Sequence, residues 1–185
     1  MHRKNVVIAL IGIAILVVAV VAVIIVLKGP DPFAPLILDA IAIRNVGNNS
    51  IAKAKIIDDM DKNIEKIKDK ETLDKWEELT NCLDAGCVDD VLFDFVLSIA
   101  IAHPDKVPSA KFVADMIVVG RFWGSGDVLK FSKALTSANE AVAAINSKDI
   151  DKKWDQIVAC NGACAEKNNL IFDEIKLVVE KGTQK

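Results

Sequence analysis

The sequence predicts an all-α protein, with an N-terminal transmembrane helix followed by a helical bundle built from two duplicated three-helix units. Three observations lead to this expectation. One apolar run near the N-terminus has no polar side chain. Beyond it, apolar residues recur every three or four positions, as on one face of a helix, and no alternating strand pattern occurs. A stretch of 13 residues containing Trp76 recurs around Trp154.

The apolar run extends over the 22 residues Val6–Leu27. At 1.5 Å per residue, a helix of this length spans about 33 Å, which is enough to cross the hydrocarbon layer. Basic residues concentrate before the run, at residues 2–4, and only Lys28 follows it closely. This asymmetry predicts a cytoplasmic N-terminus and an extracytoplasmic remainder. A cleaved signal peptide is the alternative, but the run is too long and lacks a small-residue cleavage site, so residues 1–28 are expected to be an uncleaved signal anchor in a single-pass membrane protein.

After the anchor, residues 29–48 read as a juxtamembrane segment with a short helix that stops at Gly47, and residues 49–185 as one extracytoplasmic helical domain. Residues that favour N-caps, or helix-breaking residues, separate the apolar-periodic segments of this domain. Ser50 is expected to cap one helix and Thr72 to start the next. Further helices are expected over Val88–Ala102, from a cap at Ser109 to about Val119, and over Asp127–Ile145, Ile150–Cys160 and Ala163–Lys181.

The segment Val88–Ala102 is apolar around most of its circumference, which predicts the central buried helix of the domain. It is about 15 residues long, too short to span a membrane comfortably, and it contains Asp90 and Asp94.

An internal repeat is visible without a gap. KETLDKWEELTNC (Lys70–Cys82) matches KDIDKKWDQIVAC (Lys148–Cys160), and LFD in the following helix matches a later IFD. Trp and Cys are rare, so their shared spacing indicates duplication. We predict repeat units at residues 50–102 and 127–181, joined by the helix at Ser109–Val119.

Each copy contains two cysteines around a glycine-containing turn: Cys82 and Cys87 enclose LDAG, and Cys160 and Cys164 enclose NGA. Cysteines on either side of a tight turn can bring their Cα atoms within about 5–6 Å, the separation that a disulfide requires. Extracytoplasmic thiols are usually oxidised. We therefore predict two local disulfides, Cys82–Cys87 and Cys160–Cys164, each fixing a helix-helix corner.

Three other uses of the cysteines stay open. Cross-copy pairing would join Cys82 to Cys160 and Cys87 to Cys164. A zinc site or a thiol redox couple would favour two residues between cysteines. The acidic residues nearby disfavour a thiolate.

The remaining candidate residues carry weak signals. His103 lies before Pro104 at a helix end and has no catalytic partner in the sequence. Asp89, Asp90 and Asp94 fit the positive N-terminus of a helix better than an acid pair or a metal site. The sequence GSGD is a helix break with an N-cap rather than a phosphate loop. No catalytic residue, metal site or cofactor is predicted.

Two features of the sequence are candidates for surface interactions. Phe122 and Trp123 could form an exposed aromatic contact, although burial between the copies is the simpler interpretation. Asn48 begins an Asn-Asn-Ser glycosylation pattern on the expected outer side.

The function expected from these features is interaction rather than catalysis. Beyond Lys28 the chain carries 26 acidic and 20 basic residues, which disfavours nucleic acid as a partner. The leading hypothesis is a domain held to the lipid bilayer by Val6–Leu27 that binds a protein partner, as an accessory or scaffold subunit of a membrane or cell-surface assembly. The alternative is a homopolymeric surface filament or layer subunit, whose apolar helix packs against copies of itself. A thiol-disulfide or small-ligand protein is third.

Overall fold

The computed structural model describes residues 31–47, 49–83, 86, 89–123, 127–160 and 165–183. Within these ranges the chain forms eight helices and no strand, which confirms the all-α prediction. In chain order the helices are α2 (Phe33–Asn45), α3 (Ser50–Ile64), α4 (Lys70–Leu83), α5 (Asp89–Ala102), α6 (Ala110–Phe122), α7 (Val128–Ile145), α8 (Lys148–Cys160) and α9 (Lys167–Thr183).

None of the helices in the described ranges is long and apolar enough to cross a membrane. The predicted span, Val6–Leu27, lies outside the described residues. The signal anchor therefore stays a prediction.

The predicted helix starts are close to the observed ones, but their caps differ. The cap of α3 is Asn49, whose side-chain oxygen accepts a hydrogen bond from the Ala52 amide at 3.1 Å, so the expectation that Ser50 is the cap was wrong. Ser109 precedes α6 as expected, but it has a left-handed backbone (φ 53°) and its side chain makes no capping bond. Asp127 caps α7 through the Lys130 amide, as predicted.

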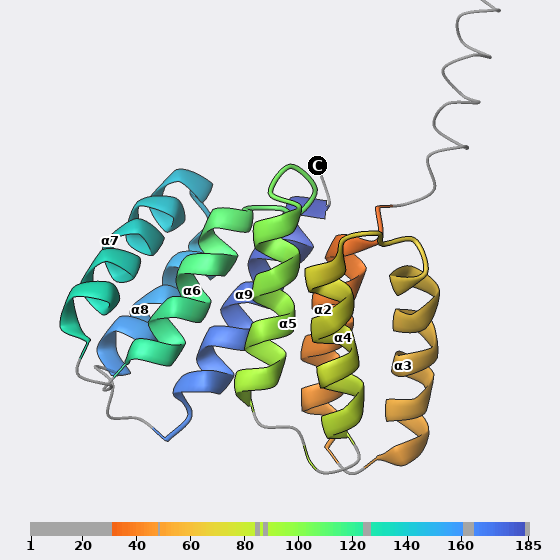
Figure 1. Ribbon diagram of the computed structural model, residues 1–185. Coiled ribbons are helices and arrows are strands. Elements are labelled where there is room, and N and C mark those ends of the chain that lie inside the picture. Colours follow the sequence, from red (N-terminus) through yellow and green to blue (C-terminus); the bar gives the residue numbers. More distant parts are fainter. Residues whose placement is uncertain are drawn as a thin grey trace, which may run out of the picture. The chain divides into compact units, whose positions relative to one another are not determined.

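Successive helices run up and down, so their ends collect at two ends of the bundle (Figure 1). The entry end contains the start of α2, the end of α9 and the turns at residues 65–69, 103–109 and 146–147. The far end contains the starts of α3, α5, α7 and α9. Pro32, where the helical unit begins, and Thr183, its last described residue, therefore lie at the same end.

The helices pack in the same pattern twice. In the first half, α2 packs on α3 and α5, and α4 packs on α5. In the second half, α6 packs on α7 and α9, and α8 packs on α9. The halves join through α5 with α6 and through α9 with α2, while α3 and α7 lie on opposite sides (Figure 1). Each half therefore contains four helices, one more than the predicted three-helix unit, because α2 and α6 occupy matching places in the two halves.

Residues at matching repeat positions meet where the halves join. Phe93 and Phe172, which are aligned by the LFD and IFD motifs, stack with ring centroids 4.4 Å apart and planes 9° from parallel. One turn earlier, the Asn168 side chain donates a hydrogen bond to Asp89 at 2.8 Å. Contact between matching residues at two successive turns is what an approximate two-fold axis between α5 and α9 produces.

The core is apolar and continuous. Helix α5 is buried along most of its length, as its composition predicted, and so is α2. The two repeated tryptophans are also buried: Trp76 packs on Phe95, and Trp154 donates a hydrogen bond from its indole nitrogen to Asn139 at 3.1 Å.

Candidate functional site

A cleft of about 670 Å³ opens at the entry end between α6, α7 and α9. We call it the α6–α7–α9 cleft. This volume falls within the range of small-molecule sites, roughly 300–1,000 Å³. The cleft is lined by Ser109, Lys111, Phe112, Ala141, Ala144, Ile145, Asn146, Ser147, Val178, Lys181 and Gly182.

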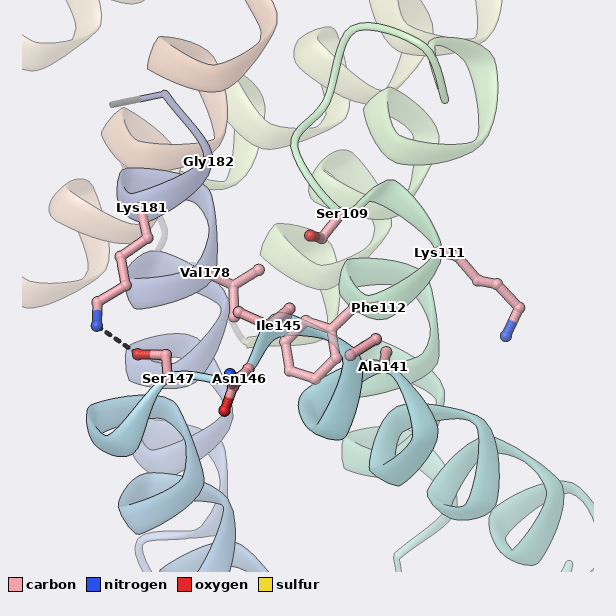
Figure 2. A pocket seen from close by; sticks show the side chains of 11 residues that line it. Ser109, Lys111, Phe112, Ala141, Ile145, Asn146, Ser147, Val178, Lys181 and Gly182 are labelled. Carbon is pink, nitrogen blue, oxygen red and sulfur yellow. Dashed lines mark hydrogen bonds between the residues drawn. The ribbon is translucent and has the colours of Figure 1, made fainter. Parts of the chain in front are cut away.

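The floor of the cleft is apolar and its edges are polar. Figure 2 shows the Phe112 ring with Ile145 and Val178 on one side of it, the Ser109 hydroxyl above it and Asn146 lower down. Phe112 and Val178 belong to the buried core, so the floor is held by packing beneath it. An apolar base with a few convergent polar groups is typical of ligand sites.

One ammonium group stands at the edge of this cleft. Lys181 donates hydrogen bonds to Ser147 and, at 2.9 Å, to Asp149, and the bond to Asp149 lowers the pKa of that carboxyl. Lys111, on the other side of the cleft, extends away from its centre (Figure 2) and pairs with Asp115 at 3.1 Å. Both lysines line the cleft, and the Lys181 ammonium stands at its edge beside Ser147.

Tight backbone geometry shapes both walls of the cleft. A Cβ atom added to Gly182 would lie 2.1 Å from Cβ of Pro108, so α9 can approach the α5–α6 turn this closely only with glycine there. Asn146 ends α7 with a left-handed backbone (φ 51°), which lets the chain reverse directly into α8. The backbone amide of Asp151 then bonds the Ser147 carbonyl at 2.8 Å, so α8 begins at the edge of the cleft.

His103 has a partner that the sequence did not reveal. Its Nε2 atom lies 2.7 Å from a carboxylate oxygen of Asp69, and its ring stacks on Phe33 with centroids 3.9 Å apart. The Asp69 carboxylate also accepts a hydrogen bond from the Thr72 backbone amide, with an N–O distance of 2.8 Å, and so caps α4. Burial opposes ionisation of Asp69, but these hydrogen bonds together hold its pKa below the ordinary value.

The acidic residues at the start of α5 form ion pairs with arginines. Arg44 donates to both carboxylate oxygens of Asp89, at 2.6 and 3.1 Å, and Arg121 bonds Asp94. The Arg44 bonds, with help from Asn168, lower the pKa of Asp89. Among the described residues, no cluster of three or more His, Cys, Asp or Glu side chains is arranged to hold a metal ion.

The predicted disulfides lie only partly within the described residues. Cys82 and Cys160 are half-buried near the far ends of α4 and α8 and pack against the core. No free thiol is found among the cysteines that the structure describes. Their predicted partners Cys87 and Cys164 lie outside the described residues, so the pairing Cys82–Cys87 and Cys160–Cys164 stays a prediction.

The two aromatic residues proposed for interaction have different surroundings. Trp123 is only 7% exposed, packs on Phe131 and accepts a hydrogen bond on its carbonyl from Lys167. Phe122 is half-buried, with the Lys130 ammonium 5.0 Å from its ring centroid. The predicted glycosylation residue, Asn48, lies outside the described residues.

Large apolar side chains are exposed beside these aromatics at the far end. Val128 and Leu129, in the first turn of α7, are 72% and 66% exposed. Ile51, in the first turn of α3, is 83% exposed and matches Leu129 in the repeat alignment.

Glu174 is a buried carboxyl that sequence reasoning missed. It is fully buried in α9, and neither of its carboxyl oxygens has a hydrogen-bond partner among the described residues. Burial raises its pKa to about 8. A signal was present in the repeat alignment, where Glu174 takes the position of the core residue Phe95.

The comparisons with known proteins add no relative. No protein-family model matches the chain, and no match was found among curated protein sequences or among solved structures.

Proposed function

We propose that the chain is a membrane-anchored, extracytoplasmic interaction domain, which serves as an accessory or scaffold subunit and binds a protein partner through its far end. The observation that carries the proposal is the exposed apolar first turn of α7. A large apolar side chain left in water gains roughly 1.5–3 kcal/mol when it is fully buried against a partner. Val128 and Leu129 are adjacent and both are mostly exposed, so together they form a small anchor point for such a partner.

The position of the predicted anchor supports the choice of the far end. Only residues 28–31 separate Val6–Leu27 from the start of the helical domain. Four extended residues reach about 14 Å at most, so an anchor at Val6–Leu27 would hold the entry end close to the bilayer. The 14 residues of α5 separate the entry end from the far end of the domain by about 21 Å, so the short linker does not tie the far end to the bilayer.

The cysteines fit the same proposal. Cys82 and Cys160 both lie at the far end, and the local pairings Cys82–Cys87 and Cys160–Cys164 would each fix a helix-helix corner at this end. A rigid surface loses less conformational freedom on binding. Peptide mapping without reduction would identify the pairs, and recovery of a Cys82–Cys160 peptide would contradict local pairing.

The experiment that tests the function is extraction of the full chain in mild detergent, followed by native mass measurement and identification of every protein that accompanies it. A stoichiometric second protein supports the proposal. Large assemblies that contain this chain alone would contradict it, and would favour the homopolymeric filament or layer.

Paired variants then test the surface. Leu129→Glu should abolish recovery of the partner, because a charge buried in an apolar contact without a counterion is strongly unfavourable. Ile101→Glu is the matched control, since Ile101 is also mostly exposed (59%) but lies in the last turn of α5, at the entry end. Equal loss of the partner in both variants would show that the first turn of α7 is not the binding surface.

A further inference from the structure

We propose that the α6–α7–α9 cleft is a binding site for a small aromatic anion, such as an aromatic carboxylate. The two halves of the domain differ at this place. The first half carries interacting side chains at three positions of its entry end, and the second half carries small residues at the corresponding positions.

The correspondence between the halves follows from three pairs of helices. For α2 and α6, six buried positions coincide at a constant spacing of 76 residues: Ala34, Leu36, Ile37, Ala40, Ile41 and Ile43 match Ala110, Phe112, Val113, Met116, Ile117 and Val119. The repeat alignment pairs the end of α3 and its following turn with the end of α7 and its turn, and pairs α5 with α9. Three positions at the entry end correspond in this way: Phe33 to Ser109, Asp69 to Ser147 and His103 to Gly182.

In the first half these three positions carry side chains that interact. The Phe33 ring stacks on the His103 imidazole at 3.9 Å, and the imidazole lies 2.7 Å from the Asp69 carboxylate. Two rings therefore occupy the space between the start of α2 and the end of α5. The aromatic stack is backed by the core, because Phe33 is itself mostly buried.

In the second half the same positions carry almost no side chain. Gly182 has none, and serine replaces both the phenylalanine and the aspartate. All three residues line the α6–α7–α9 cleft, together with the apolar floor formed by Phe112 and Val178. Ser109 thus leaves room where the first half has the Phe33 ring, whereas a side chain at position 182 would meet Pro108. A planar aromatic group is a shape that fits this room.

The polar groups around the cleft favour a negative charge on the ligand. Lys181 stands at the edge with two hydrogen bonds made and a third donor available. The Ser109 hydroxyl and the Asn146 amide add neutral donors (Figure 2). The start of α8 at Ser147 contributes the positive end of a helix dipole. An aromatic carboxylate with its ring on Phe112 and its carboxylate group directed toward Lys181 would contact both the apolar floor and the polar edge of the cleft.

The experiment is a calorimetric titration of the full chain in mild detergent with 2-naphthoate, and with 2-naphthylmethylamine as a probe of similar shape and opposite charge. We expect saturable binding of 2-naphthoate with one site per chain, and at least about tenfold weaker binding of the amine. Lys181→Met should reduce that preference for the anion, because the cation at the edge is removed.

Two neighbouring alanines provide a matched pair of variants. Ala144 lines the cleft and Ala143 does not, although both are exposed residues of α7. Ala144→Phe should fill the cleft and weaken 2-naphthoate binding at least about tenfold, whereas Ala143→Phe should bind as the unmodified chain does. Thermal unfolding of each variant checks that the fold is kept.

Three results would overturn the proposal. They are the absence of saturable 2-naphthoate binding at millimolar concentrations, equal binding of the anion and the amine, and unchanged binding by folded Ala144→Phe. Because the protein partner is assigned to the far end, loss of this site leaves the proposed interaction function standing.

Discussion

Phe93 and Phe172 hold matching positions in the two halves of the domain and stack directly on each other, 4.4 Å apart and 9° from parallel. Because one ring belongs to each half, this stack joins the two halves directly. Gly120 of α6 lies against Phe93 and against Ile171, the neighbour of Phe172 in the chain, since a Cβ added there would approach Ile171 at 3.0 Å and Phe93 at 3.2 Å. The centre of the domain is therefore closely packed around these rings.

Truncation of either ring should destabilise the whole domain. Phe93→Ala and Phe172→Ala are each expected to lower the free energy of unfolding by roughly 3–5 kcal/mol, through lost burial and a cavity. The double variant should lose less than the sum, with a coupling of about 0.5–1.5 kcal/mol from the ring pair. Chemical denaturation of the four proteins measures the coupling, and strict additivity would show that the stack contributes nothing beyond burial.

Glu174 should make stability depend on pH. Burial raises its folded-state pKa to about 8, so the folded chain holds a proton there that the unfolded chain releases near pH 4.5. Stability is then fully present below the unfolded pKa and falls as pH rises toward 8, with a slope of up to about 1.4 kcal/mol per pH unit. Nearby charges from Lys153, Asp151, Asp173 and Lys181 modify this shift.

Glu174→Gln removes the titration and should flatten the dependence of unfolding free energy on pH between 5 and 8. Glu174→Phe copies the first half, where Phe95 holds this position. An unchanged slope in the glutamine variant would assign the dependence to another group.

The ion pair between Arg44 and Asp89 should contribute stability that disappears in acid. The guanidinium hydrogen bonds lower the pKa of Asp89, so its contribution is present above the unfolded pKa and is lost as pH falls through the folded pKa. Asp89→Asn should lower the free energy of unfolding at pH 7 by roughly 1–2 kcal/mol. The difference from the unmodified chain should disappear once the pH has fallen through the folded-state pKa of Asp89, and a difference that persists in stronger acid would indicate a packing effect instead.

The two roles of Asp69 can be separated by a pair of substitutions. Asp69→Asn keeps a good cap for the Thr72 amide and removes only the carboxylate from His103, whereas Asp69→Ala removes both. We expect the alanine variant to unfold more easily than the asparagine variant by about 1 kcal/mol, the usual contribution of an N-cap. Equal stabilities in thermal unfolding would show that the cap does not contribute.

Local patterns were enough to predict the helices. Apolar spacing and breaking residues located them to within a few residues, and the apolar circumference of Val88–Ala102 identified the buried α5. Capping was less predictable, because Asn49 and Ser50 are both good cap residues and only the backbone of the turn decides between them.

The sites depended on contacts that a linear sequence does not contain. His103 and Asp69 are 34 positions apart and meet only because α4 and α5 are antiparallel neighbours. The α6–α7–α9 cleft is lined in part by the small residues Ser109, Ser147 and Gly182, and small residues carry no chemical signature. Their significance becomes visible only by comparison with the first half, where larger side chains stand at the corresponding positions.

The first helix of the domain packs on the last one, just as α5 packs on α6 at the other junction. The halves thus meet through two matching junctions, and only α5–α6 is spanned by a short turn of the chain, at residues 103–109. Two fragments produced by a cut within that turn would each keep the apolar helix surfaces through which the halves pack on each other. The domain is consequently suited to fragment complementation, in which two separately expressed halves reassemble and report when two cellular components come together.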